Sequence, residues 1–274
     1  MIEKKNKVQE VFQNLSQKNE KALICYVVGG YPDEETSKEI IRTIINSGAD
    51  IIEIGIPFSD PMADGPTIQQ ASLKALENGI TPQKCFSIVN QLKNEFNDTP
   101  FLFMTYSNIV FTNNFKNFLN MSKKNHVDGF IIPDLNVEES KEYVEIAKGL
   151  GLATIFLTAP NTSKNRLNDI ASASTGFVYM VSVFGITGSR TNFEKYTYDA
   201  IKDTKNILQN HKVPLAVGFG ISNPKDGKNI IQAGADGIII GSSIMKLIME
   251  NETDKKNMLS NLSSFIKDMK TACK

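Results

Sequence analysis

Two acidic side chains lie near the end of an apolar segment, where they could exchange protons with a substrate. Glu53 stands within the isoleucine-rich segment 50–55, although burying a charge there costs free energy. Asp64 follows in a segment that contains Asp60 and three prolines, Pro57, Pro61 and Pro66. Carboxyl groups in unlike surroundings can divide general acid and general base roles. The spacing predicts a catalytic pair; for Glu53 the alternative is a structural acid bonded to backbone amides.

Three glycine-bearing segments later in the chain have the composition of a phosphate site. They cover residues 185–190, 218–220 and 241–243. Glycine allows backbone N–H groups to approach an anion, and a helix N-terminus adds a partial positive charge. We therefore expect them to bind a phosphate together. For Gly241 and Ser242 alone, an ordinary helix N-cap is the alternative.

The elements that must position these residues alternate along the chain. Apolar runs predict strands at 22–28, 50–55, 101–105, 127–132, 153–157, 177–183, 214–217 and 237–240. Polar segments with helical periodicity predict helices at 33–47, 81–96, 114–124, 137–150, 164–174, 193–209, 224–233 and from Ser243 onward. Residues 2–19 predict a further amphipathic helix before the first strand.

Eight strand–helix units in 274 residues predict an α/β fold, one (β/α)8 TIM barrel over residues 1–274 with an extra N-terminal helix. An open doubly wound sheet is the alternative, but no G-x-G-x-x-G motif opens the first strand–helix turn. Active-site residues of such barrels follow the strands. This rule places Glu53, Asp64 and Asp134 at one mouth, with Tyr179 if its side chain faces inward. Core packing is the alternative for Tyr179.

Segments 47–55, 126–132 and 233–241 also resemble one another, which supports repeated units.

Composition excludes several classes of protein. The 30 basic and 30 acidic residues balance, which argues against a general nucleic-acid or anionic-membrane surface. Three scattered cysteines without a CxxC motif favour a reducing compartment, and two distant histidines do not form a zinc pattern. No apolar run approaches the roughly 20 residues that span a bilayer. We expect a soluble, cytoplasmic protein.

The longest motif points to a family. The run from Glu53 to Gln69, EIGIPFSDPMADGPTIQ, resembles the signature of the tryptophan synthase alpha subunit, and similar segments occur at 30–32, 133–140, 182–188 and 218–222. The resemblance implies cleavage of indole-3-glycerol phosphate to indole and glyceraldehyde 3-phosphate, without a metal or organic cofactor. It also implies an alpha2beta2 heterotetramer, in which pyridoxal phosphate belongs to the beta subunit that consumes the indole to make L-tryptophan.

Carried over residue by residue, the resemblance assigns roles to individual positions. Glu53 and Asp64 would be the catalytic acids, with Tyr179 beside Glu53, while Asp60 would shape the loop. The expected phosphate contacts are Gly188, Gly220, Gly241 and Ser242. The expected indole pocket draws on Tyr26, Met104, Ile131 and Phe219. Thr187 would link its loop to that of Asp64 and close the site against water.

Two segments depart from the commonest forms of this family. Met62 replaces a frequent leucine, and Val183-Phe184 lies in a variable part of the closing loop, so both positions bear on partner specificity. The sequence does not decide which acid performs each proton transfer. An allosteric subunit with little activity of its own, or another phosphate-binding barrel such as an isomerase, are the alternative functions.

Overall fold

A computed structural model describes residues 6–112, 114–181, 195–218 and 220–274. Eight parallel strands pair in chain order and close into a barrel, so the predicted TIM barrel is confirmed and the open sheet is wrong. The strands are β1 (Ala22–Val28), β2 (Ile51–Gly55), β3 (Phe101–Met104), β4 (Gly129–Ile131), β5 (Ala153–Thr158), β6 (Val178–Met180), β7 (Leu215–Val217) and β8 (Gly237–Ile240).

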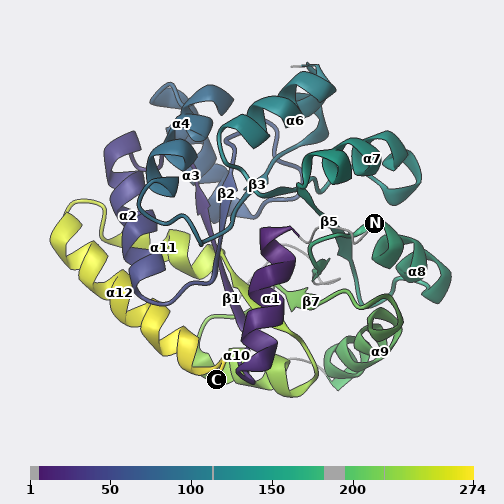
Figure 1. The fold of residues 1–274 in the computed structure, drawn as a ribbon. Helices are drawn as coiled ribbons and strands as arrows, with labels where there is room; N and C mark the ends of the chain where they lie inside the picture. Colours follow the sequence, from purple (N-terminus) through teal and green to yellow (C-terminus); the bar gives the residue numbers. More distant parts are fainter. Residues whose placement is uncertain (1–5, 113, 182–194, 219) are drawn as a thin grey trace.

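Helices form a ring around the strands (Figure 1). Those in the first half are α1 (Lys7–Gln17), α2 (Glu34–Asn46), α3 (Pro66–Glu77), α4 (Pro82–Lys93), α5 (Ser107–Thr112) and α6 (Phe115–Lys124). Those in the second half are the short 3-10 helix η1 (Val137–Glu139), α7 (Lys141–Leu150), α8 (Lys164–Ala173), α9 (Lys195–His211), α10 (Pro224–Gln232), α11 (Ser242–Glu250) and α12 (Lys255–Thr271).

Two helices, α3 and α5, were not predicted, and the last predicted helix is divided into α11 and α12. The proline-rich run before α3 indicated a loop, yet Pro66 occupies the first turn of α3, where its missing N–H costs nothing. The buried face of α3 consists of the small residues Ala71, Ser72 and Ala75, which leave little hydrophobic periodicity to detect.

Helix α1 covers the amino-terminal end of the barrel, which faces the viewer in Figure 1. Its buried residues Val8, Phe12 and Leu15 belong to the same cluster as the inward residues of the strands. The Phe12 and Phe177 rings lie 5.6 Å apart. The carboxyl ends of the strands, with the loops that follow them, therefore form the opposite mouth.

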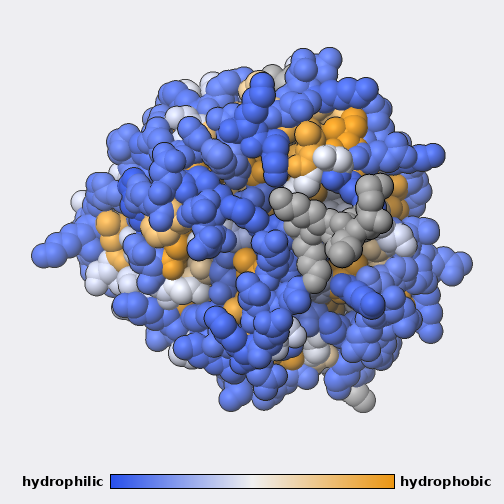
Figure 2. Space-filling model, viewed as in Figure 1, coloured by the Kyte–Doolittle hydropathy of each residue, from blue (hydrophilic) through white to orange (hydrophobic). Residues whose placement is uncertain are grey.

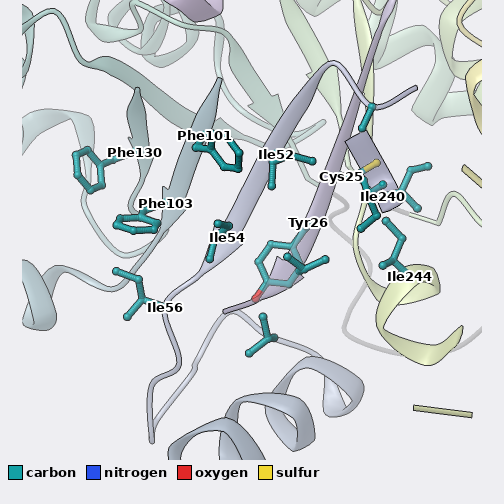
Figure 3. Packing of buried hydrophobic residues seen from close by; sticks show 14 of the residues in the cluster. Cys25, Tyr26, Ile52, Ile54, Ile56, Phe101, Phe103, Phe130, Ile240 and Ile244 are labelled. Atoms are coloured by element: carbon teal, nitrogen blue, oxygen red, sulfur yellow. The ribbon is translucent and has the colours of Figure 1, made fainter. Parts of the chain in front are cut away.

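The strand side chains alternate between the barrel interior and the surrounding helices. Figure 3 shows Ile52 and Ile54 of β2 beside Phe101 and Phe103 of β3, with Phe130 of β4 next to them. These residues belong to the outer core, where the Phe103 and Phe130 rings lie 6.2 Å apart. Because successive side chains of a strand point to opposite faces, Glu53 points into the barrel.

The internal sequence repeat has a structural explanation. Asp50, Asp128 and Asp236 each precede a strand, and each accepts a hydrogen bond from a backbone N–H of the preceding strand. Each also pairs with a lysine from an outer helix. The three sets are Asp50 with Leu23 and Lys270, Asp128 with Phe101 and Lys93, and Asp236 with Leu215 and Lys205. The repeat thus ties neighbouring strands and helices together.

The surface seen in Figure 2 is mostly hydrophilic, with small hydrophobic groups between the helices. Within the described ranges, no helix has the length and apolar character needed to cross a membrane. Cys25, Cys85 and Cys273 are all free and buried.

Candidate active site

Glu53 is a completely buried acid in the middle of β2. Neither of its carboxyl oxygens has a hydrogen-bond partner among the described residues. The alternative for Glu53 was a structural acid bonded to backbone amides. Within the described residues, no backbone amide bonds to this carboxyl. Burial, and secondarily the negative charge of Asp64, raise the pKa of Glu53 to about 8. Glu53 is protonated at neutral pH and can donate a proton.

Asp64 lies in the loop that joins β2 to α3 and is only 7% exposed. Gln69 Nε2 donates a hydrogen bond to the Asp64 carbonyl oxygen at 2.8 Å, which fixes the backbone. Burial raises the pKa of the Asp64 carboxyl, while a hydrogen bond from Tyr106 lowers it. That bond runs from Tyr106 Oη to Asp64 Oδ2 over 3.1 Å.

Tyr106 was not predicted as a site residue. It follows the end of β3 by two positions, so the rule that functional residues follow the strands would have included it. An isolated tyrosine after a strand has no distinctive spacing, and only the folded chain shows its contact with Asp64.

Two more tyrosines lie near the acids. Tyr179 of β6 belongs to the cluster that fills the barrel interior, and its hydroxyl lies against Gly218. Tyr26 of β1 is in register with Glu53. Burial, together with the negative charges of Glu53 and Asp64, raises the pKa of both tyrosines well above the ordinary value. Tyr179 thus meets the condition of an inward-facing side chain, and both hydroxyls are protonated at neutral pH.

Three of the four predicted phosphate residues, Gly220, Gly241 and Ser242, lie after β7 and β8. Gly241 is the N-cap of α11 and Ser242 its first residue, and no side chain forms a capping hydrogen bond there. Ser243 Oγ donates to the Ile221 carbonyl oxygen at 3.1 Å, which joins the two loops. Gly220 has φ +62°, a conformation that favours glycine. A helix N-terminus without a side-chain cap among the described residues, next to a glycine turn, is a type of site that can hold an anion.

Tyr26 lies between the two parts of the site. A Cβ atom added at Gly55 would come within 2.1 Å of Tyr26 Oη, and one added at Gly241 within 3.1 Å of its ring. The ring therefore occupies the space between the carboxyl end of β2 and the start of α11. Met104 of β3 and Ile131 of β4, also predicted to line the indole pocket, are register partners in the interior cluster.

The remaining predicted site residues either lie outside the described residues or form bonds elsewhere. Gly188, Thr187, Phe219 and the pair Val183-Phe184 lie outside the described residues, so their roles stay predictions. Asp134 does lie after β4, but its carboxylate accepts hydrogen bonds from Ser107 N at 2.9 Å and Ser107 Oγ at 2.6 Å. It therefore connects two loops. No three His, Cys, Asp or Glu residues gather as metal ligands within the described ranges.

The arrangement combines a buried protonated acid, a second acid held by a tyrosine, apolar walls and a glycine turn beside the N-terminus of α11 at one mouth. Such a site can move protons on a small phosphorylated substrate with an apolar group.

Comparison with known proteins agrees with this chemistry. Residues 12–274 match the family model described as tryptophan synthase alpha chain. The tryptophan synthase alpha chain of Francisella tularensis is 41% identical over 97% of this chain and 98% of its own length. That of Petrotoga mobilis is 42% identical over 97% and 99%. A structure of Mycobacterium tuberculosis tryptophan synthase superposes with a TM-score of 0.87 at 30% identity, covering 98% of this chain and 99% of that one.

Proposed function

The chain belongs to the tryptophan synthase alpha chain family, and on that basis we propose that Glu53 and Asp64 perform its reaction. The enzyme is a carbon–carbon lyase that cleaves indole-3-glycerol phosphate to indole and glyceraldehyde 3-phosphate. The observation that carries the residue assignment is the buried Glu53 carboxyl, which has no hydrogen-bond partner among the described residues and a pKa raised to about 8.

Glu53 supplies the proton that starts the cleavage. Protonation of indole C3 converts the ring to an electron-poor indolenine. The neighbouring hydroxyl of the glycerol chain then loses its proton, the bond from C3 to that carbon breaks, and its electron pair restores the aromatic indole. The hydroxyl carbon leaves as the aldehyde. Glu53 gives one proton to C3 and takes one from the hydroxyl, so it returns to its starting state.

Asp64 acts in its ionised form. A carboxylate beside the ring nitrogen accepts the N–H hydrogen bond, which strengthens as positive charge develops on the indolenine. The two acids thus divide the work because their surroundings differ: Glu53 has no hydrogen bond within the described chain, whereas Asp64 accepts one from Tyr106. Tyr179 borders the same space. No metal or organic cofactor is needed for these transfers.

The substrate is held at its two ends. Gly220, Gly241 and Ser242 bind the phosphate through backbone amides, together with Gly188. Tyr26, Met104, Ile131 and Phe219 line the indole pocket, and Thr187 closes it. This assignment is supported by the position of Tyr26 between the acids and α11.

Family membership implies a beta chain as partner, and we assign the docking surface to the mouth of the barrel. Met62 after β2 is 78% exposed and Phe111 of α5 is 56% exposed, an unusual exposure for large apolar side chains. The prolines of the Met62 loop reduce the entropy lost when a partner docks. An alpha2beta2 complex with pyridoxal phosphate on the beta chain fits this surface, and the free cysteines fit a cytoplasmic location.

The test is indole release from indole-3-glycerol phosphate by the purified chain, with a beta chain titrated in. We expect release by the chain alone and a higher rate with the partner. If indole appeared at no partner concentration, the catalytic assignment would be wrong and the allosteric role would remain.

A further inference from the structure

We propose that Tyr106 is a positioning residue, which holds the Asp64 carboxylate in place from the neighbouring loop. The proposal rests on the proposed function, because it concerns how Asp64 is prepared for the reaction.

The Tyr106 hydroxyl has a defined direction. It accepts a hydrogen bond from Ala63 N at 3.0 Å and donates its single proton to Asp64 Oδ2 at 3.1 Å. Since the N–H of Ala63 can only donate, the hydroxyl proton is left to face Asp64. The Oδ2 atom accepts this bond, a role that suits an ionised carboxylate. One hydroxyl thus binds both the backbone and the side chain of the loop after β2.

The Tyr106 ring is itself fixed. Tyr106 is 5% exposed, and its ring centroid lies 5.1 Å from that of Phe58. The next residue, Ser107, donates from both its backbone N and its Oγ to the two carboxylate oxygens of Asp134, at 2.9 and 2.6 Å. The hydrogen bonds of Ser107 to Asp134 and of Tyr106 to Asp64 are therefore connected by the backbone of these two consecutive residues. Together they join the loops after β4, β3 and β2.

The ionisation of Asp64 depends on the Tyr106 hydrogen bond and on the titratable groups that surround it. Glu53 of β2, Tyr26 of β1 and Tyr179 of β6 interact electrostatically with Asp64, and Asp134 interacts with Tyr106. Glu53, whose pKa is raised to about 8, is mostly neutral at neutral pH, and burial keeps the tyrosines protonated. The Tyr106 hydrogen bond lowers the pKa of Asp64 against the effect of burial, which raises it. Loss of the hydroxyl must raise the pKa of Asp64, so that the active ionised form is lost at a higher pH.

The decisive experiment is the pH dependence of kcat/KM for Tyr106→Phe, which keeps the ring and removes the hydroxyl. We expect the acidic limb of the profile to shift to higher pH by about one unit. At pH values above that limb, kcat/KM should return to within about threefold of the wild type. Asp134→Ala should move the limb in the same direction by a smaller amount. Combined with Tyr106→Phe it should add no further shift, since Asp134 acts through Tyr106.

Tyr143→Phe is the matched control. Tyr143 of α7 is buried against Phe115 and Phe156, and its hydroxyl has no hydrogen-bond partner among the described residues. Its substitution should leave both limbs unchanged. An acidic limb that stays in place in Tyr106→Phe, in an enzyme that Glu53→Gln inactivates, would overturn this proposal and leave the proposed function intact. A fully active Glu53→Gln enzyme would instead contradict the proposed function itself.

Discussion

Asp64 lies near enough to Glu53 for its negative charge to raise the pKa of Glu53, which burial raises further, to about 8. The cleavage requires protonated Glu53, so kcat/KM should fall as the pH rises through about 8, where Glu53 loses its proton. A pH–rate profile from pH 6 to 10 measures this basic limb. Asp64→Asn removes the neighbouring charge and should move the pKa of Glu53 downward, which a titration of the Glu53 carboxyl by NMR can follow. A basic limb that is absent below pH 10 would contradict the assignment.

Gly220→Ala should weaken phosphate binding. The φ of +62° at Gly220 is unfavourable for alanine, so the turn must shift, and KM should rise about tenfold with a smaller change in kcat. Steady-state kinetics checks this expectation. Gly79→Ala is the matched control, because Gly79 has φ +71° after α3, where among the described residues only Lys84 lies within 4 Å of an added Cβ. An equal rise of KM in both variants would point to general strain in place of phosphate contact.

The position of the catalytic acid follows from the sequence, whereas its protonation state does not. The isoleucines on both sides of Glu53 indicated a buried strand, and the alternation of strands and helices located its end at the mouth of a barrel. The pKa of Glu53 depends on which side chains from other strands surround it. That information exists only in the folded chain.

The elements and contacts that could not be predicted from the sequence have a weak hydrophobic pattern or join residues far apart in the chain. Helix α3 buries Ala71, Ser72 and Ala75, and α5 is only 6 residues long, so neither produces a clear hydrophobic period. The contact between Tyr106 and Asp64 spans 42 positions and joins two loops, and neither residue alone indicates the other. The repeated aspartates were visible in the sequence, but their lysine partners lie on distant helices.

Lys93→Met should destabilise the barrel by about 3 kcal/mol, because it leaves the Asp128 carboxylate without its cationic partner at a buried position. Urea denaturation measures the free energy of unfolding. Glu95→Gln, which removes the more exposed pair with Arg42, should cost much less, because water screens that pair. Equal losses in the two variants would contradict a structural role for the repeated aspartate–lysine pairs.

Phe111→Asp should weaken binding of the beta chain at least about tenfold and leave indole release by the isolated chain unchanged. The ring of Phe111 is exposed and stacks on Phe115 with the centroids 5.5 Å apart, so an apolar partner can cover it with little rearrangement. Titration calorimetry with a beta chain gives the dissociation constant. Met121→Asp on α6, at another exposed apolar residue, should bind the partner normally. If both variants bound equally well, the docking surface would lie elsewhere.

The substitution Glu53→Gln tests whether the buried Glu53 carboxyl moves the protons of the cleavage. Glutamine keeps the size of the side chain and removes its titratable proton. Indole release from indole-3-glycerol phosphate should fall by a factor of about 100 to 10,000 or more, while circular dichroism and the melting temperature show a folded barrel. A folded Glu53→Gln enzyme that releases indole at the wild-type rate would contradict this role of Glu53.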